Sequence, residues 1–354
     1  CLTVGAHQSQ ALNIPGENFP GVVHGIELLK AINLSQQLAG YDPLAAARYS
    51  GLLKKALRRG TATRVAILGG GNTAMDAARS LIRLGVKDVS ILYRRTRAEM
   101  PAMPEEIEEA ELEGVKFEYL VAPERILGDE ENGVSGLECL RMRLGEPDAS
   151  GRRRPVPIAN SEFVVDLDLV VLAIGQNPDL GFLAQQDGIA ITRDKRINVA
   201  DLSFMTNRPG VFAAGDAVTK DKMVVIEAIG MGKQAAAAMD AYLRGQPLHE
   251  TVVDARAIPT SRRVMGNTEL TPKARIPVPT ITLQQRINTF NEVEQGFTAE
   301  QAVAEAQRCL ACGPCSECMA CVHVCKTGAI NHDQPESFVE LDIGAILYSD
   351  VEVS

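Results

Sequence analysis

Short apolar runs alternate with segments of helical pattern between residues 64 and 176. This alternation is typical of a parallel sheet whose strands are joined by crossover helices. The last strand is apolar along its length, which predicts burial on both faces of the sheet. We expect strands at residues 64–68, 89–93, 115–120 and 168–174, with helices at 72–84 and 105–113.

The segments on either side of this region predict further elements. Helices are expected at 24–39 and 43–59, and a strand at 211–214 precedes an Ala-rich helix at 223–243. Within the alternating region, residues 125–165 predict a two-stranded excursion. Its tip carries Arg152, Arg153 and Arg154, which we expect to form a solvated turn.

The C-terminal third has a different composition. Residues 246–297 are rich in Pro and Thr and predict an extended connection. A helix is expected at 298–308, with Thr298 and Gln301 placed as a capping box. A strand-like segment follows at 338–347.

A glycine-rich turn follows the first strand of the alternating region. Gly69, Gly71 and Ala74 fit the pattern G-x-G-x-x-A, and Asn72 and Thr73 open the next helix. The first glycine permits a tight turn, the second lets the backbone approach a pyrophosphate, and the alanine allows close packing of helix and strand. Free N–H groups at the helix N-terminus attract phosphate. The turn therefore predicts dinucleotide binding, and a packing turn that binds nothing is the alternative.

Two arginines follow the second strand, where proteins selective for NAD carry an acidic residue. Arg94 and Arg95 stand in that place. A guanidinium group matches a phosphate in shape and charge, which favours NADPH over NADH. In the alternative interpretation, these arginines only cover the acidic helix that starts near Glu105.

A second small-residue motif, Gly210–Ala217, ends on Gly-Asp-Ala. Asp216 would accept a hydrogen bond from a ribityl hydroxyl, and Gly215 would let the backbone come close to a flavin. The helix that begins near Val225 would direct its positive end towards the pyrimidine edge of the flavin. Ala228 lies in the small-residue run on this helix. Taken alone, the motif is equally compatible with an ordinary turn.

Six of the eight cysteines lie in one short window. The last four have the C-x2-C-x2-C-x3-C spacing of a ferredoxin [4Fe–4S] cluster. Zinc sites separate their cysteine pairs by about a dozen residues or more, and disulfide proteins spread their cysteines along the chain. Zinc and disulfides are the alternatives. The six predicted metal ligands are Cys309, Cys312, Cys315, Cys318, Cys321 and Cys325.

The cysteine window departs from the ferredoxin pattern in two ways. Lys326 stands where ferredoxins have Pro, and six thiolates are more than one cluster needs and fewer than two clusters need. His323 within the window is expected to face solvent. Outside the window, Cys1 and Cys139 are expected to be buried apolar residues.

The order of these motifs resembles the flavoproteins with two dinucleotide-binding domains, and within them the small (beta) subunit of NADPH-dependent glutamate synthase and its relatives. The resemblance implies an α/β, glutathione reductase-like fold that binds FAD and NADPH. It also implies that Gly5 lies on the flavin side and that Gly175 and Gln176 lie near the nicotinamide. The matching segments are Thr3–Ala6, Ile14–Glu17, Gly69–Arg79, Tyr93–Arg95, Met100–Ala102, Ala173–Pro178 and Gly210–Ala217.

The resemblance also implies the domain boundaries. The sequence departs from the family in two ways. The family's first glycine-rich turn, which binds FAD, should precede residue 1 and is absent from this sequence. The cysteines follow the flavin domain, whereas the glutamate synthase subunit carries them before it. We expect the chain to be part of a larger polypeptide or complex. The expected parts are 1–62, a partial FAD-binding domain; 63–176, the NADPH-binding domain; 177–250, the second part of the FAD-binding domain; 251–297, a linker; 298–334, the iron–sulfur segment; and 335–354, a tail.

Composition narrows the class of protein. The chain is 45% hydrophobic and 23% charged, as in ordinary globular proteins. No apolar run approaches the ~20 residues that span a bilayer. A net charge of −9 and the absence of Trp argue against nucleic-acid binding. The clustering of the cysteines and the absence of a visible secretory signal favour a cytoplasmic protein.

The expected function is electron transfer. NADPH would reduce FAD, and the [4Fe–4S] segment would exchange single electrons with a partner subunit or a ferredoxin. No catalytic side chain is required. The alternatives are electron flow from ferredoxin to NADP, and a role like that of the iron–sulfur flavoprotein subunit of heterodisulfide reductase, which the cysteine segment and Leu341–Ile346 faintly resemble. A non-catalytic scaffold that docks a catalytic subunit is the remaining alternative.

Overall fold

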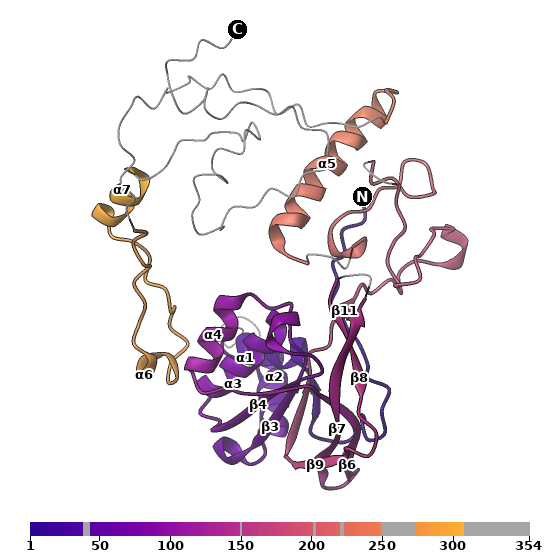
Figure 1. Cartoon of the computed structure of the whole chain (residues 1–354). Helices are drawn as coiled ribbons and strands as arrows, with labels where there is room; N and C mark the ends of the chain where they lie inside the picture. The colour runs from indigo at the N-terminus through magenta and orange to yellow at the C-terminus, as the bar shows by residue number, and fades with distance from the viewer. Residues whose placement is uncertain (38–42, 149–150, 201–202, 220–222, 249–273, 308–354) are drawn as a thin grey trace. The chain divides into compact units, whose positions relative to one another are not determined.

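The structure is a computed structural model that describes residues 1–37, 43–148, 151–200, 203–219, 223–248 and 274–307 (Figure 1). The chain divides into two compact units. The first comprises Cys1–Gln246 and Ile281–Val293, and the second comprises Pro247–Thr280 and Glu294–Ser354. Within the part described, no helix is both long and apolar enough to cross a membrane.

A five-stranded parallel sheet organises the first unit. Leu68 of β3 pairs with Leu172 of β10 and Leu92 of β4, so the carboxyl ends of these strands lie at one level. In sheet order the strands are β2 (Val22–His24), β10 (Leu169–Leu172), β3 (Arg64–Leu68), β4 (Asp88–Tyr93) and β5 (Lys116–Tyr119). This order is that of a dinucleotide-binding fold, in which ligands bind at the carboxyl edge.

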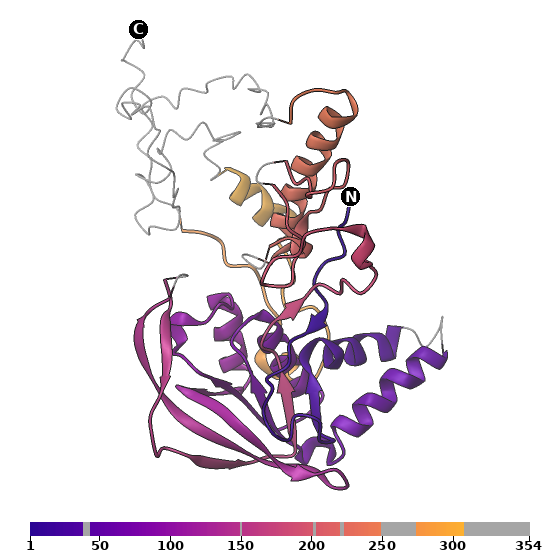
Figure 2. The ribbon, with the colours of Figure 1, turned by 90° about the vertical axis from the view of Figure 1, so that its right-hand side faces the viewer.

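Each face of this sheet is covered by a different layer (Figure 2). Val65 and Ile67 point to the helices, where they pack with Met75 and Leu81. Leu68 and other alternate residues point to an antiparallel sheet. All four residues of β10 are at most 2% exposed, which confirms the expected burial on both faces. The helices are α1 (Gly25–Gln37), α2 (Pro43–Ala56), α3 (Asn72–Arg83) and α4 (Pro104–Leu112).

The antiparallel sheet replaces the two-stranded excursion expected at 125–165. It has four strands, because the long strand β7 pairs with three others. The expectation of two strands was wrong because β7 runs through 15 residues without a break, too far for one partner to match. The strands are β6 (Val121–Asp129), β7 (Gly133–Pro147), β8 (Arg153–Pro157) and β9 (Phe163–Asp166).

Residues beyond the parallel sheet form a less regular region. The strand expected at 211–214 is only a pair of isolated bridges, from Ala213 to Leu2 and from Phe212 to Met205. A two-stranded ribbon, β1 (Gln8–Ser9) with β11 (Gln176–Asn177), joins this region to the sheet. Short turns η4 (Gln185–Asp187) and η5 (Gly215–Ala217) precede helix α5 (Val225–Leu243).

The Pro- and Thr-rich connection contains a short helix that the sequence did not predict. Helix α6 (Leu283–Arg286) is capped by Thr282, and the neighbouring Ile287 packs against the core between the sheet and its helices. Arg286 also contacts Glu109 of α4 at 3.5 Å. An apolar residue and one ion pair therefore anchor this part of the connection.

In the second unit, α7 (Ala299–Gln307) begins where the sequence predicted. The Gln301 N–H donates to Thr298 Oγ1 at 3.2 Å, and the Thr298 N–H donates to Gln301 Oε1 at 2.9 Å. This reciprocal pair confirms the capping box. The cysteine window and the predicted strand at 338–347 lie outside the described residues.

A buried carboxylate ties β10 to β3 at the amino end of the sheet. Asp168 Oδ2 accepts from the Arg64 backbone N–H at 2.9 Å and from Arg64 Nε at 3.0 Å. Arg59 lies 2.9 Å from its other oxygen. Burial alone would raise the pKa of Asp168, but hydrogen bonds and charge from Arg64, with help from Arg59, hold it below its usual value.

We predict that Asp168→Asn lowers the free energy of unfolding by about 1–3 kcal/mol, because Arg64 and Arg59 lose a charged acceptor. Urea denaturation near neutral pH measures this change. Asp166→Asn is the matched control, since that side chain is 79% exposed and 3.8 Å from Arg64. The control should alter stability little.

The difference in unfolding free energy between wild type and Asp168→Asn should depend on pH. A carboxyl group whose folded-state pKa is depressed stabilises the protein fully above its unfolded value of ~3.9. That contribution is lost as the pH falls through the lower folded-state pKa. The gap between wild type and Asp168→Asn should therefore close in acid, and a gap that persists undiminished well below the folded-state pKa would refute this role of the carboxylate.

Candidate functional site

The glycine-rich turn lies at the carboxyl edge of the parallel sheet, between β3 and α3. Gly69 has φ of 143°, and a Cβ atom there would lie 2.2 Å from the Ala173 carbonyl oxygen. A Cβ on Gly70 would lie 2.6 Å from the Tyr93 ring. Only glycine fits these two positions, because the backbone after β10 approaches Gly69 and the Tyr93 ring packs against Gly70.

Gly71 differs from its two neighbours. A Cβ atom there would have one neighbour, Pro101, at 3.9 Å. Gly71 is the N-cap residue of α3, and no side chain in the described part of the chain caps this helix. The N–H groups of Asn72 and Thr73 therefore stand at an uncapped helix end beside open space, while Ala74 is fully buried. This arrangement fits a pyrophosphate group.

A short loop holds the turn in place from the other side. The Ala102 N–H donates to the Gly70 carbonyl at 3.1 Å, and the Met103 N–H donates to Asn72 Oδ1 at 3.0 Å. The side-chain oxygen of Asn72 is thus occupied by the protein, and the backbone N–H of Asn72 is open to a ligand. The Met100–Ala102 motif therefore has a structural role at the turn.

The two arginines after β4 have different surroundings. Arg95 is 6% exposed, and its guanidinium group donates to Asp148 at 2.8 Å and to the Arg153 carbonyl at 2.7 Å. Arg94 is exposed and has no partner among the described residues. Among the described residues, neither arginine pairs with α4. The acidic residues of α4 and the C-cap residue Glu113 instead contact Arg79, Arg83, Arg97 and Arg286. The interpretation that they only cover the acidic helix therefore has no support.

Gly175 and Gln176 lie where the chain leaves the parallel sheet. Gly175 has φ of 122°, and its carbonyl accepts from the Gln10 N–H at 3.1 Å. Gln176 pairs with Ser9 in the β1–β11 ribbon. The structure therefore places both residues at the point where the parallel sheet connects to the β1–β11 ribbon.

The Gly-Asp-Ala motif forms the tight turn η5. Gly215 has φ of 71°, and a Cβ atom on it would have the Cβ of Ala228 in α5 as its nearest neighbour, at 3.7 Å. The Asp216 carboxylate is half-buried and has no hydrogen-bond partner in the described part of the chain. A free carboxylate beside small residues fits a ligand that carries hydroxyl groups.

Gly5 belongs to the same region. Leu2 pairs in parallel with Ala213, so the segments that lead to Gly5 and to Gly215 run side by side in one direction. A Cβ on Gly5 would meet no atom of the described residues within 4 Å. The structure thus brings Gly5 and Gly215 to the ends of two neighbouring segments. This is the arrangement that the edge of a dinucleotide-binding sheet requires.

Sequence reasoning missed Arg196, which the structure places between the two predicted sites. Arg196 is 3% exposed, and its guanidinium group donates to the carbonyl oxygens of Gln176 and Asp216. A single arginine in a polar turn has no periodic or motif signal, so no sequence pattern could have singled it out.

The six predicted cluster ligands, Cys309 to Cys325, lie outside the described residues. Of the two cysteines within them, Cys139 is fully buried as expected, and burial raises the pKa of its thiol to about 12. Cys1 is exposed, so the expectation that it is buried was wrong. Among the described residues, no group of His, Cys, Asp and Glu side chains could hold a metal ion.

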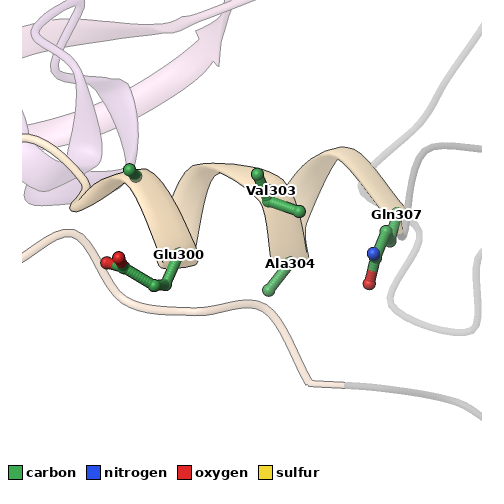
Figure 3. A pocket seen from close by; sticks show the side chains of 5 residues that line it. Glu300, Val303, Ala304 and Gln307 are labelled. Atoms are coloured by element: carbon green, nitrogen blue, oxygen red, sulfur yellow. The ribbon is translucent and has the colours of Figure 1, made fainter.

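A pocket on α7 is a weaker candidate (Figure 3). Its lining comes entirely from that helix, including Glu300, Val303 and Gln307. Because residues of one helix cannot converge on a ligand from several sides, this pocket indicates no binding site.

Comparison with known proteins extends these observations. A family model for pyridine nucleotide-disulphide oxidoreductases matches residues 2–239. The NADP(+)-dependent formate dehydrogenase subunit beta of Moorella thermoacetica is 38% identical over 319 residues, which are 88% of this chain and 42% of that protein. The glutamate synthase [NADPH] small chain of Azospirillum brasilense is 36% identical over 69% of this chain and 48% of its own length.

Solved structures agree on the fold. Mycobacterium tuberculosis FprA in complex with NADPH superimposes with a TM-score of 0.52 at 18% identity, over 69% of this chain and 63% of that one. At this identity the likeness concerns the fold alone. The chain spans about half the length, or less, of the curated relatives it matches.

We predict that Gly71→Ser weakens NADP+ binding about tenfold or more without loss of stability. Serine is a favoured N-cap residue, and among the described residues its Cβ would meet Pro101 alone. The serine side chain would, however, fill the space next to the helix N-terminus. Isothermal titration with NADP+ and a thermal melt measure the two effects. Gly69→Ala is the contrasting control and should unfold at lower temperature, because its Cβ collides with Ala173. Unaltered NADP+ affinity in Gly71→Ser would exclude this turn as the pyrophosphate site.

We also predict that Arg94→Ala raises the dissociation constant for NADP+ about tenfold or more and leaves that for NAD+ unchanged. The reason is that the exposed guanidinium of Arg94 is free to contact a 2′-phosphate. Arg193→Ala, at another exposed cation, is the control. If NADP+ and NAD+ affinities fall together, Arg94 does not select the phosphate.

Proposed function

The chain belongs to the pyridine nucleotide-disulphide oxidoreductase family, and we propose that it forms the NADPH- and flavin-handling part of an electron-transfer protein. The observation that carries this proposal is that two ligand-compatible turns lie in one compact unit. One turn offers uncapped helix N–H groups at Gly71, and the other offers the Asp216 carboxylate. The ribbon that begins at Gln176 joins them.

The proposed NADPH-binding domain is built on the parallel sheet. Gly69 and Gly71 would give the pyrophosphate room, the N–H groups of Asn72 and Thr73 would bind it, and Arg94 would contact the 2′-phosphate. We propose that this domain begins at β2 rather than at residue 63, because β2 pairs with β10 in the same sheet. Arg95 would act by holding the β7–β8 hairpin through Asp148.

The proposed flavin side uses Gly5, Gly215, Asp216 and Ala228. The small residues would let FAD approach the backbone, and Asp216 would accept a hydrogen bond from a ribityl hydroxyl. The N-terminus of α5, at Val225, would direct its positive end at the flavin. When bound, FAD supplies the conversion between two-electron and one-electron transfer.

We propose that the cysteine window carries electrons onward through a [4Fe–4S] cluster. The ferredoxin-like spacing of the cysteines supports this proposal. The length of the alignment with the Moorella thermoacetica subunit supports it as well. The 88% of this chain that aligns with the Moorella thermoacetica subunit exceeds the segment 2–239 that the family model covers. That relative is named as a subunit, which supports a partner subunit for this chain as well. The acceptor or donor would be that partner or a ferredoxin.

The direction of electron flow has two candidates. The name of the Azospirillum brasilense relative specifies NADPH, which supports flow from NADPH to the partner. The name of the Moorella thermoacetica relative specifies NADP(+), which supports flow towards NADP. Both directions use the same residues, because binding and positioning are the protein's contribution in each.

We predict that the native protein, purified without oxygen, contains flavin, iron and acid-labile sulfide. Cys315→Ser and Cys325→Ser should lose iron and sulfide yet keep NADPH-dependent bleaching of the flavin, because the thiolates ligate the cluster and not the flavin. Cys1→Ser, at an exposed cysteine, should retain all three. Elemental analysis and visible absorbance measure these outcomes. Zinc in place of iron would contradict the cluster, and absence of flavin would contradict the proposed function.

A further inference from the structure

Arg196 contacts both predicted cofactor sites at once. Its Nη2 donates to the Gln176 carbonyl at 3.1 Å, and its Nη1 donates to the Asp216 carbonyl. Nη2 also lies 3.7 Å from the sulfur of Met223, just before α5. One buried side chain thus bridges the end of the nicotinamide-side sheet and the flavin-side turn.

The backbone around Arg196 fixes where this side chain starts. Thr192 and Arg196 close a tight turn, in which the Thr192 N–H donates to the Arg196 carbonyl at 2.8 Å and the Arg196 N–H donates to Thr192 Oγ1 at 3.2 Å. Lys195 takes a left-handed conformation, with φ of 58°. The next N–H, of Ile197, donates to the Ala217 carbonyl at 2.9 Å. The turn is therefore tied directly to η5.

Arginine is suited to this bridge by its shape. Its planar fork presents several N–H donors at fixed angles, so one group can bind two carbonyl oxygens on different segments. Lysine carries its charge on a single nitrogen at the end of a flexible stem and cannot reproduce the fork. Burying a guanidinium is costly unless hydrogen bonds replace its water, and the bonds of Nη1 and Nη2 do so here.

We propose that Arg196 is a positioning residue that holds η5 at a set distance from β11, and so fixes the spacing between the flavin-side and nicotinamide-side sites. This inference rests on the proposed function, because the spacing matters only if electrons pass between the two sites. It assigns no contact with a cofactor to Arg196. Its effect passes through the backbones of Gln176 and Asp216.

The test compares Arg196→Met and Arg196→Lys in the native protein with bound flavin. Arg196→Met should lower the rate of flavin reduction at saturating NADPH about tenfold or more, because small misplacements of reacting groups slow transfer strongly. The dissociation constant for NADP+ should stay within about twofold of wild type, since the Gly69–Gly71 turn is untouched. Arg196→Lys should be intermediate, because it retains one of the two contacts.

Arg208→Met is the matched control. Arg208 is an exposed arginine of the same region that donates to the Asp187 carbonyl at 3.3 Å. It should leave the rate, the NADP+ affinity and the melting temperature unchanged. A merely structural role for Arg196 would lower melting temperature, flavin content and NADP+ affinity together, and that pattern would overturn the inference.

The remaining outcomes separate this inference from the proposed function. A wild-type protein that holds flavin and reduces it with NADPH, alongside an Arg196→Met variant of equal rate, refutes the positioning role alone. A wild-type protein without flavin, or without reduction by NADPH, refutes the proposed function and this inference with it.

Discussion

The candidate nucleotide site depends on one close approach of backbone to backbone. At the carboxyl edge of the parallel sheet, Gly69 leaves no room for a Cβ atom because the Ala173 carbonyl oxygen would lie 2.2 Å away. This approach brings the turn after β3 against the end of β10. It leaves α3 with an uncapped N-terminus that faces open space beside Gly71. This main-chain geometry alone fits an anion, before any charged side chain is considered.

The end of β10, which Gly69 approaches, also leads into the segments beyond the parallel sheet. Ala173 leads within a few residues to Gln176, where the chain passes from the sheet into the region that contains η5. Arg196 fastens η5 to that point through two carbonyl oxygens. Two turns that are far apart in sequence are therefore linked through one short ribbon and one buried side chain. A hydride carrier and a flavin need such a fixed relation, because transfer depends steeply on position.

Much of this arrangement could be predicted from sequence, because strong local patterns encode it. Apolar runs predicted four strands of the parallel sheet, β3, β4, β5 and β10, to within two residues at each end, but not β2. The Gly69–Ala74 motif predicted the tight turn between β3 and α3. Long-range pairing has no such signal. The extra strands beside β7 form only through contacts distant in sequence, and the segment at 211–214 has the composition of a strand without partners to complete one. Arg196 was missed for a related reason, since its role arises only when two separate backbones meet.

The decisive experiment is anaerobic rapid mixing of the native protein that contains this chain with NADPH, followed by the visible flavin absorbance. We expect fast bleaching by NADPH, much slower bleaching by the same concentration of NADH, and a clearly smaller or slower fast phase in Gly71→Ser at a concentration that just saturates wild type. A flavin that NADPH does not bleach, or a fast phase indifferent to the Gly71 substitution, would contradict the proposed use of this turn.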